Sequence, residues 1–117
     1  MKATAKWKEI APMNHARANF AAISIGGAAY VFGGISGVDG HSPVLATDVI
    51  ERYTARDNKW EVYDIPQVSQ LAAFSWARHD EGSIFVLGGT DGNLLSQDLI
   101  LINFKEQTSL RTPANFP

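Results

Sequence analysis

Apolar residues occur along the chain in short runs, and glycine or polar residues separate one run from the next. Residues 20–25 and 28–32 form two such runs on either side of a glycine pair. Residues 74–79 and 83–87 form another two around a second glycine-containing turn. Paired runs joined by a turn of this kind are typical of β-hairpins. The pattern therefore predicts one hairpin in each half of the chain.

Further apolar residues follow each predicted hairpin. Residues 49–53 lead into a polar turn, and a fourth strand is predicted to begin at Trp60. Residues 98–103 and Leu110 occupy the corresponding places in the second half. No long stretch has the 3.6-residue apolar period of a helix. The chain is therefore predicted to be all-β, with four short antiparallel strands in each half.

The two halves are copies of one repeat. Gly33-Gly34 follow the hairpin of the first copy, and Gly88-Gly89 follow that of the second copy 55 residues later. Glycine within a sheet is unfavourable by roughly 0.5–1 kcal/mol relative to alanine, so pairs of glycines at the same place in both copies need a steric reason. We expect neighbouring strands to crowd these positions; the alternative is a simple turn at the strand end.

The third and fourth strands repeat at a shorter offset. Tyr53 corresponds to Asn103 and Trp60 to Leu110, both 50 residues later, so the second copy lacks both aromatic residues. We expect the outer packing of that copy to be poorer. Tyr53 and Trp60 each have a large apolar body and a polar tip. We expect them to pack between neighbouring sheets, with ligand stacking as the alternative.

An apolar run ending in two glycines, then a tyrosine, six residues and a tryptophan, is the pattern of Kelch repeats. The chain resembles this family from Trp7 to about Leu110. The resemblance implies a β-propeller, in which each repeat forms one four-stranded blade. We expect an all-β, partial Kelch-type β-propeller with two four-stranded antiparallel blades and one N-terminal strand at residues 7–10. The expected units are the end of a preceding blade with its lead-in at 1–15, repeat one at 16–65, a degenerate repeat two at 66–112, and the lead-in to a further blade at 113–117.

Two blades do not close a propeller, which needs roughly four to eight. Open blade faces and unpaired strand edges would leave apolar surface and backbone groups in water. We therefore expect the chain to be completed either by further blades of a longer propeller or by self-association.

The resemblance also implies where a partner binds. In Kelch propellers, the loops from strand four to the next strand one, and from strand two to strand three, lie on one face and usually hold the partner. Here these are residues 12–19, 68–71, 35–47 and 90–97. The candidate binding residues are Arg17, Asn19, Ser36, Asp39, His41, Asp91 and Asn93. For Arg17, an ion pair or hydrogen bond within the propeller is the alternative to partner contact, and Leu71 takes its place in the second copy.

Composition narrows the function classes. The net charge is −2 and the charges are interspersed, so nucleic acid is not an expected partner. No apolar run approaches the roughly 20 residues that cross a bilayer, and residues 1–7 lack the apolar segment of a secretory signal. The chain has no cysteine and its three histidines are scattered, so we expect a cytoplasmic location, no metal site and no cofactor.

The expected function is a protein-binding scaffold that uses its loops, without enzyme activity of its own. The alternative is part of a Kelch-type propeller enzyme acting on a sugar, which converging acid and base groups at the ring centre would indicate. A third alternative is that these blades only maintain a propeller ring.

Overall fold

The computed structural model describes residues 6–36, 45–66 and 70–113. Within these ranges every regular element is a β-strand, as the sequence predicts, and no helix of the kind that crosses a membrane is found. The strands are β1 Ala21–Ile25, β2 Ala28–Phe32, β3 Ile35–Ser36, β4 Leu45–Ala46, β5 Glu51–Thr54, β6 Lys59–Val62, β7 Ser75–Asp80, β8 Ser83–Leu87, β9 Asp98–Asn103 and β10 Thr108–Pro113.

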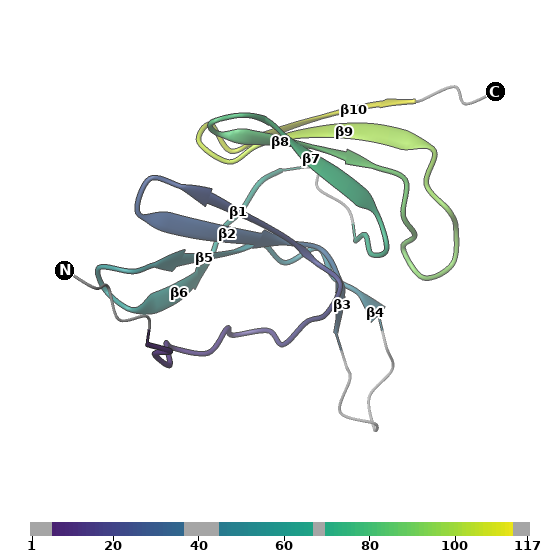
Figure 1. Cartoon of the computed structure of the whole chain (residues 1–117). Helices are drawn as coiled ribbons and strands as arrows, with labels where there is room; N and C mark the ends of the chain where they lie inside the picture. Colours follow the sequence, from purple (N-terminus) through teal and green to yellow (C-terminus); the bar gives the residue numbers. More distant parts are fainter. Residues whose placement is uncertain (1–5, 37–44, 67–69, 114–117) are drawn as a thin grey trace.

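Eight of these strands form two four-stranded antiparallel sheets. The strand order is β1-β2-β5-β6 in blade one and β10-β9-β8-β7 in blade two. Figure 1 shows the two blades stacked one above the other. The prediction of two four-stranded antiparallel blades is therefore confirmed. The sequence pattern did not predict the short β3–β4 ladder, in which Ile35 pairs with Ala46.

The prediction of an N-terminal strand at residues 7–10 was wrong. These residues have no β-pairing in the described part of the chain, and the Trp7 side chain is fully exposed. A strand needs a neighbouring backbone to pair with, and the described residues provide none beside this segment. The chain instead meets blade one at Ala11, whose carbonyl oxygen accepts a 2.7 Å hydrogen bond from the Trp60 indole.

The outer strands of the two blades correspond at an offset of 49 residues, not 50. Asn58 in the β5–β6 turn has a φ of 48°, and Gln107 in the β9–β10 turn has a φ of 56°. The cross-strand pair Tyr53–Trp60 in blade one therefore corresponds to the cross-strand pair Ile102–Ser109 in blade two. The predicted counterparts, Asn103 and Leu110, were therefore wrong by one residue.

The hydrophobic core lies between the two blades. Because side chains alternate along a strand, each blade has an inner face toward the other blade and an outer face away from it. Aromatic rings join the two inner faces: the ring centroids of Tyr30 and Phe104 are 5.1 Å apart, and those of Phe32 and Phe74 are 5.3 Å apart. The buried residues of this core are Ala21, Ile23, Ile25, Tyr30, Phe32, Ile50, Ile65, Leu71, Ile84, Val86, Ile100, Ile102 and Phe104.

The glycine pairs sit where the chain is crowded. A Cβ atom at Gly34 would lie 2.5 Å from the Ala18 carbonyl oxygen, and one at Gly89 would lie 2.7 Å from the Ala72 carbonyl oxygen. Gly33 is crowded in the same way by the Phe74 ring. The expected crowding is thus confirmed at three of the four positions. At Gly88 the nearest atom is 3.9 Å away, so space does not explain that glycine.

Candidate binding face

One end of the molecule gathers the loops that the sequence assigned to binding. Figure 1 shows β3, β4 and the β8–β9 connection at this end, whereas the tight turns between β1 and β2, β5 and β6, and β7 and β8 lie at the opposite end. We call this end the loop face. Its described residues are 18–19, 35–36, 45–47, 70–71 and 90–97. Residues 12–16, which the sequence also assigned to binding, run along blade one, where the Asn14 side-chain amide donates to the Trp60 carbonyl oxygen.

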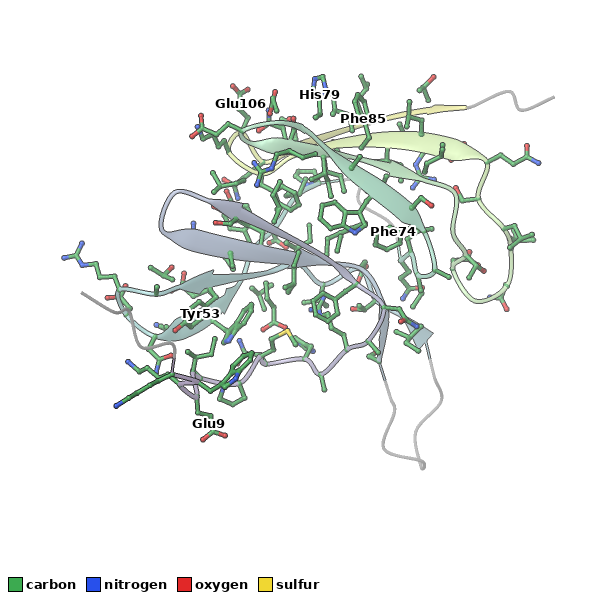
Figure 2. The ribbon with its side chains drawn as sticks, viewed as in Figure 1. Glu9, Tyr53, Phe74, His79, Phe85 and Glu106 are labelled. Atoms are coloured by element: carbon green, nitrogen blue, oxygen red, sulfur yellow. The ribbon has the colours of Figure 1, made fainter. Side chains whose placement is uncertain are left out.

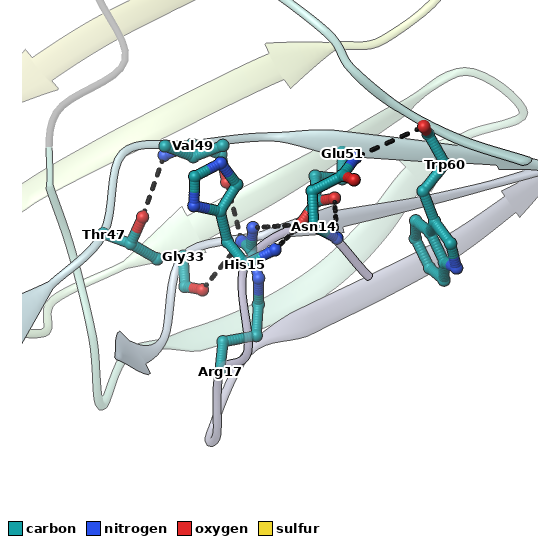
Figure 3. A network of polar contacts seen from close by, with 8 residues as sticks. All are labelled: Asn14, His15, Arg17, Gly33, Thr47, Val49, Glu51 and Trp60. Atoms are coloured by element: carbon teal, nitrogen blue, oxygen red, sulfur yellow. Dashed lines mark hydrogen bonds and ion pairs between the residues drawn. The ribbon is translucent and has the colours of Figure 1, made fainter. Parts of the chain in front are cut away.

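Arg17 lies inside the fold, behind the loop face. Its guanidinium donates to the carbonyl oxygens of Gly33 and Val49, at 3.2 and 2.6 Å (Figure 3). It also forms a 3.0 Å ion pair with Glu51, and both side chains are fully buried. The two backbone acceptors lie on strand ends of blade one, so Arg17 ties the entering chain to that blade. A buried guanidinium held in this way presents no surface to a partner.

Glu51 completes the buried network. Its carboxylate accepts the backbone N–H groups of Asn14 and His15, at 2.8 and 3.1 Å, in addition to the Arg17 guanidinium (Figure 3). Burial lowers the pKa of Arg17 from its ordinary value, and the hydrogen bond and negative charge of Glu51 partly restore it. The charges therefore compensate each other where water is excluded.

Blade two has an apolar version of the same place. Asn19 and Ala73 share a left-handed backbone conformation 54 residues apart, so Arg17 corresponds to Leu71 as the sequence predicted. The counterpart of Glu51 at the 49-residue offset is Ile100. Leu71 and Ile100 are both buried members of the core. The ion pair of blade one is thus matched by two aliphatic side chains in blade two.

The other candidate residues fall into separate groups. Asn19 is exposed beside the start of β1 with a φ of 55°. Ser36 is half-buried in β3. Asp39 and His41 lie outside the described residues, so their placement stays a prediction.

Asp91 and Asn93 are exposed together in the β8–β9 loop. One carboxylate oxygen of Asp91 accepts the backbone N–H groups of Asn93 and Leu94, both at 2.8 Å. These two hydrogen bonds hold the pKa of Asp91 below its ordinary value, because they stabilise the charged carboxylate. Asp91 therefore shapes the loop while its charge remains at the surface.

A surface hollow of about 380 Å³ opens beside this loop. It is lined by Gln70 and Leu71 from the connection between the blades, by Asp91 and residues 94–98, and by Arg111 of β10. Leu94 and Leu95 are 73% and 85% exposed. An open hollow with aliphatic side chains and a polar border is suited to binding.

Charged groups of this border are partly neutralised by one another. The Arg111 guanidinium lies 2.8 Å from the Asp98 carboxylate, and both side chains are partly exposed. The sequence reasoning missed Leu94, Leu95, Asp98 and Arg111 as lining residues. Two adjacent leucines within a polar loop are a signal that could have pointed to them, because such a loop is exposed on a propeller face.

Comparisons with known proteins agree with this geometry. The Kelch motif family model matches residues 16–63, which include all of blade one. A solved structure titled "Structure of YjhT" is similar over 94% of this chain, with a TM-score of 0.78 and 16% sequence identity, a likeness that shows the fold alone. This chain covers 42% of that protein. No curated protein matches the chain. Residues 16–63 therefore match the Kelch motif, and the chain as a whole folds as two neighbouring four-stranded blades, like part of the solved structure.

Proposed function

We propose that this chain is a protein-binding scaffold, without catalytic activity of its own, and that the loop face of blade two holds an extended peptide segment of the partner. The observation that carries the proposal is the hollow bordered by the exposed Leu94 and Leu95. Kelch repeats generally mediate protein–protein interaction, which supports the same assignment.

The chemistry of the hollow fits a peptide with an aliphatic side chain. Leu94 and Leu95 offer apolar contact, while the side-chain amides of Gln70 and Gln97 offer donors and acceptors for a peptide backbone. The nearby carboxylates already make contacts within the chain: Asp98 forms an ion pair with Arg111, and Asp91 accepts a backbone hydrogen bond from Asn93 in its own loop. These contacts favour binding over acid–base catalysis at this place.

We also propose that the two blades are completed by further blades or by copies of the chain, since apolar residues on their outer faces, such as Val62 of blade one and Leu110 of blade two, are exposed. A cytoplasmic location is proposed with this role, because the absence of cysteine among the 117 residues fits a reducing compartment.

A random peptide library displayed on phage tests the binding role. The immobilised wild-type chain is expected to enrich peptides with a shared aliphatic position, and the double variant Leu94→Ser, Leu95→Ser is expected to bind those peptides at least about tenfold more weakly. Val62→Ser is the matched control, because Val62 is an exposed apolar residue of β6, outside the loop face. Peptide binding that is equal in all three chains, or no enrichment at all, would rule out this site.

A further inference from the structure

The outer face of blade two is apolar and open. Its cross-strand row consists of Ala77, Phe85, Leu101 and Leu110, and none of these side chains is buried. Beside this row, Ala77, Phe85, Leu87 and Leu99 line a shallow hollow of about 310 Å³. Figure 2 shows Phe85 on the side of blade two away from blade one, whereas Phe74 lies between the blades.

The corresponding face of blade one is the inner face, which blade two covers. At the repeat offsets, Ala77 corresponds to Ile23 and Phe85 to Tyr30, and the pairings Ala77–Phe85 and Ile23–Tyr30 match. Ile23 and Tyr30 are buried against blade two. The outer face of blade two thus repeats a surface that this chain already covers once with a blade.

The covering surface is repeated as well. Blade two covers blade one with its inner face, where the Ser109 hydroxyl donates to the Pro66 carbonyl oxygen at 2.8 Å. Blade one has the same arrangement on its outer face, where the Trp60 indole donates to the Ala11 carbonyl oxygen. Figure 2 shows Tyr53 on this side of blade one, away from blade two. The chain therefore carries both halves of a blade–blade interface, one at each end of the stack.

We propose that the outer face of blade two binds the outer face of blade one in a second copy of this chain, repeating head to tail the interface between the two blades. This inference rests on the proposed completion of the two blades by copies of the chain. It does not depend on peptide binding at the loop face. Such contacts close into a ring if the rotation allows, and three copies would supply six blades, within the roughly four to eight of known propellers.

The internal interface specifies contacts between the copies. The Gly34 N–H donates to the Leu71 carbonyl oxygen across the two blades, at 2.9 Å. Its counterpart joins the Gly89 N–H to the Arg17 carbonyl oxygen of the second copy. The ring contact between Tyr30 and Phe104 corresponds to Phe85 facing Ala55, because Ala55 and Phe104 open equivalent turns and donate to equivalent glycine carbonyl oxygens.

Sedimentation velocity over a range of concentrations tests this arrangement. The wild-type chain is expected to associate as its concentration rises, and Phe85→Asp is expected to sediment as a monomer because a carboxylate would be buried in the interface. Leu94→Asp is the matched control on the loop face and should associate like the wild type. Circular dichroism checks that each variant keeps its β-structure. The Leu94→Asp control separates association of the copies from peptide binding at the hollow.

A second variant should strengthen the association. Ala55→Phe places a ring where the internal interface has Phe104, so it should lower the dissociation constant about tenfold. Arg56→Phe, one residue farther along the same turn, should leave the dissociation constant nearly unchanged. A wild-type chain that stays monomeric at every concentration would overturn the proposal. Equal effects of Ala55→Phe and Arg56→Phe would also overturn it.

Discussion

Replacement of Arg17 by leucine is expected to lower the free energy of unfolding by about 3–5 kcal/mol, because it leaves the Glu51 carboxylate buried without its cation. Three hydrogen bonds from the guanidinium are lost with the charge. Urea denaturation followed by circular dichroism measures the change. A loss below about 1 kcal/mol would mean that water reaches Glu51 and replaces the ion pair.

The double variant Arg17→Leu, Glu51→Ile is the informative companion. It gives blade one the two residues that blade two has at these places, Leu71 and Ile100. An apolar pair of suitable volume can replace a buried ion pair at little cost, so most of the lost stability should return. The N–H groups of Asn14 and His15 lose their acceptor and the carbonyl oxygens of Gly33 and Val49 lose their donor, so the recovery should be incomplete. A double variant less stable than Arg17→Leu would contradict the correspondence between the blades.

The second large effect is expected at Gly34. Substitution by alanine should lower the free energy of unfolding by about 3 kcal/mol, because φ is +93° and the new Cβ would lie 2.5 Å from a backbone oxygen. The same denaturation experiment measures it.

Gly27→Ala is the matched control for this substitution. Gly27 has open space around it and no positive φ, so the change should stay within about 0.5 kcal/mol. Equal effects at Gly27 and Gly34 would show that the crowding seen at the glycine pair does not exist in solution.

Hairpins and glycine pairs could be predicted from the sequence because their signals are local. The runs before and after Gly26-Gly27 are short and apolar, and the turn between them is encoded by adjacent residues. The N-terminal strand was wrong for the opposite reason. This strand was predicted from the place of Trp7 in the repeat pattern, but a strand also needs a pairing partner, which no local pattern can reveal.

The offset of the outer strands was missed because blade two lacks the aromatic residues that mark the register in blade one. Without them, Asn103 and Leu110 looked as suitable as Ile102 and Ser109. The register is set by the turn, where the backbone at Gln107 repeats the left-handed conformation of Asn58. Glutamine seldom adopts a left-handed backbone conformation, so the sequence alone does not indicate one at this position.

The candidate site was partly predictable. The assignment of residues 90–97 to a binding loop followed from the repeat, and Asp91 lines the hollow found there. The role of Arg17 was left between two alternatives because its partner, Glu51, is 34 residues away in sequence. Only the fold shows that the two side chains meet and that water is excluded from them.

The central claim is that the two blades pack face to face as neighbours in a propeller. Nuclear Overhauser effects between ring protons measure this most directly. We predict cross-peaks between Tyr30 and Phe104 and between Phe32 and Phe74, whose ring centroids are 5.1 and 5.3 Å apart. Cross-peaks confined to pairs within one blade, such as Tyr53 with Trp60, would show that the blades do not pack in this way and would contradict the account.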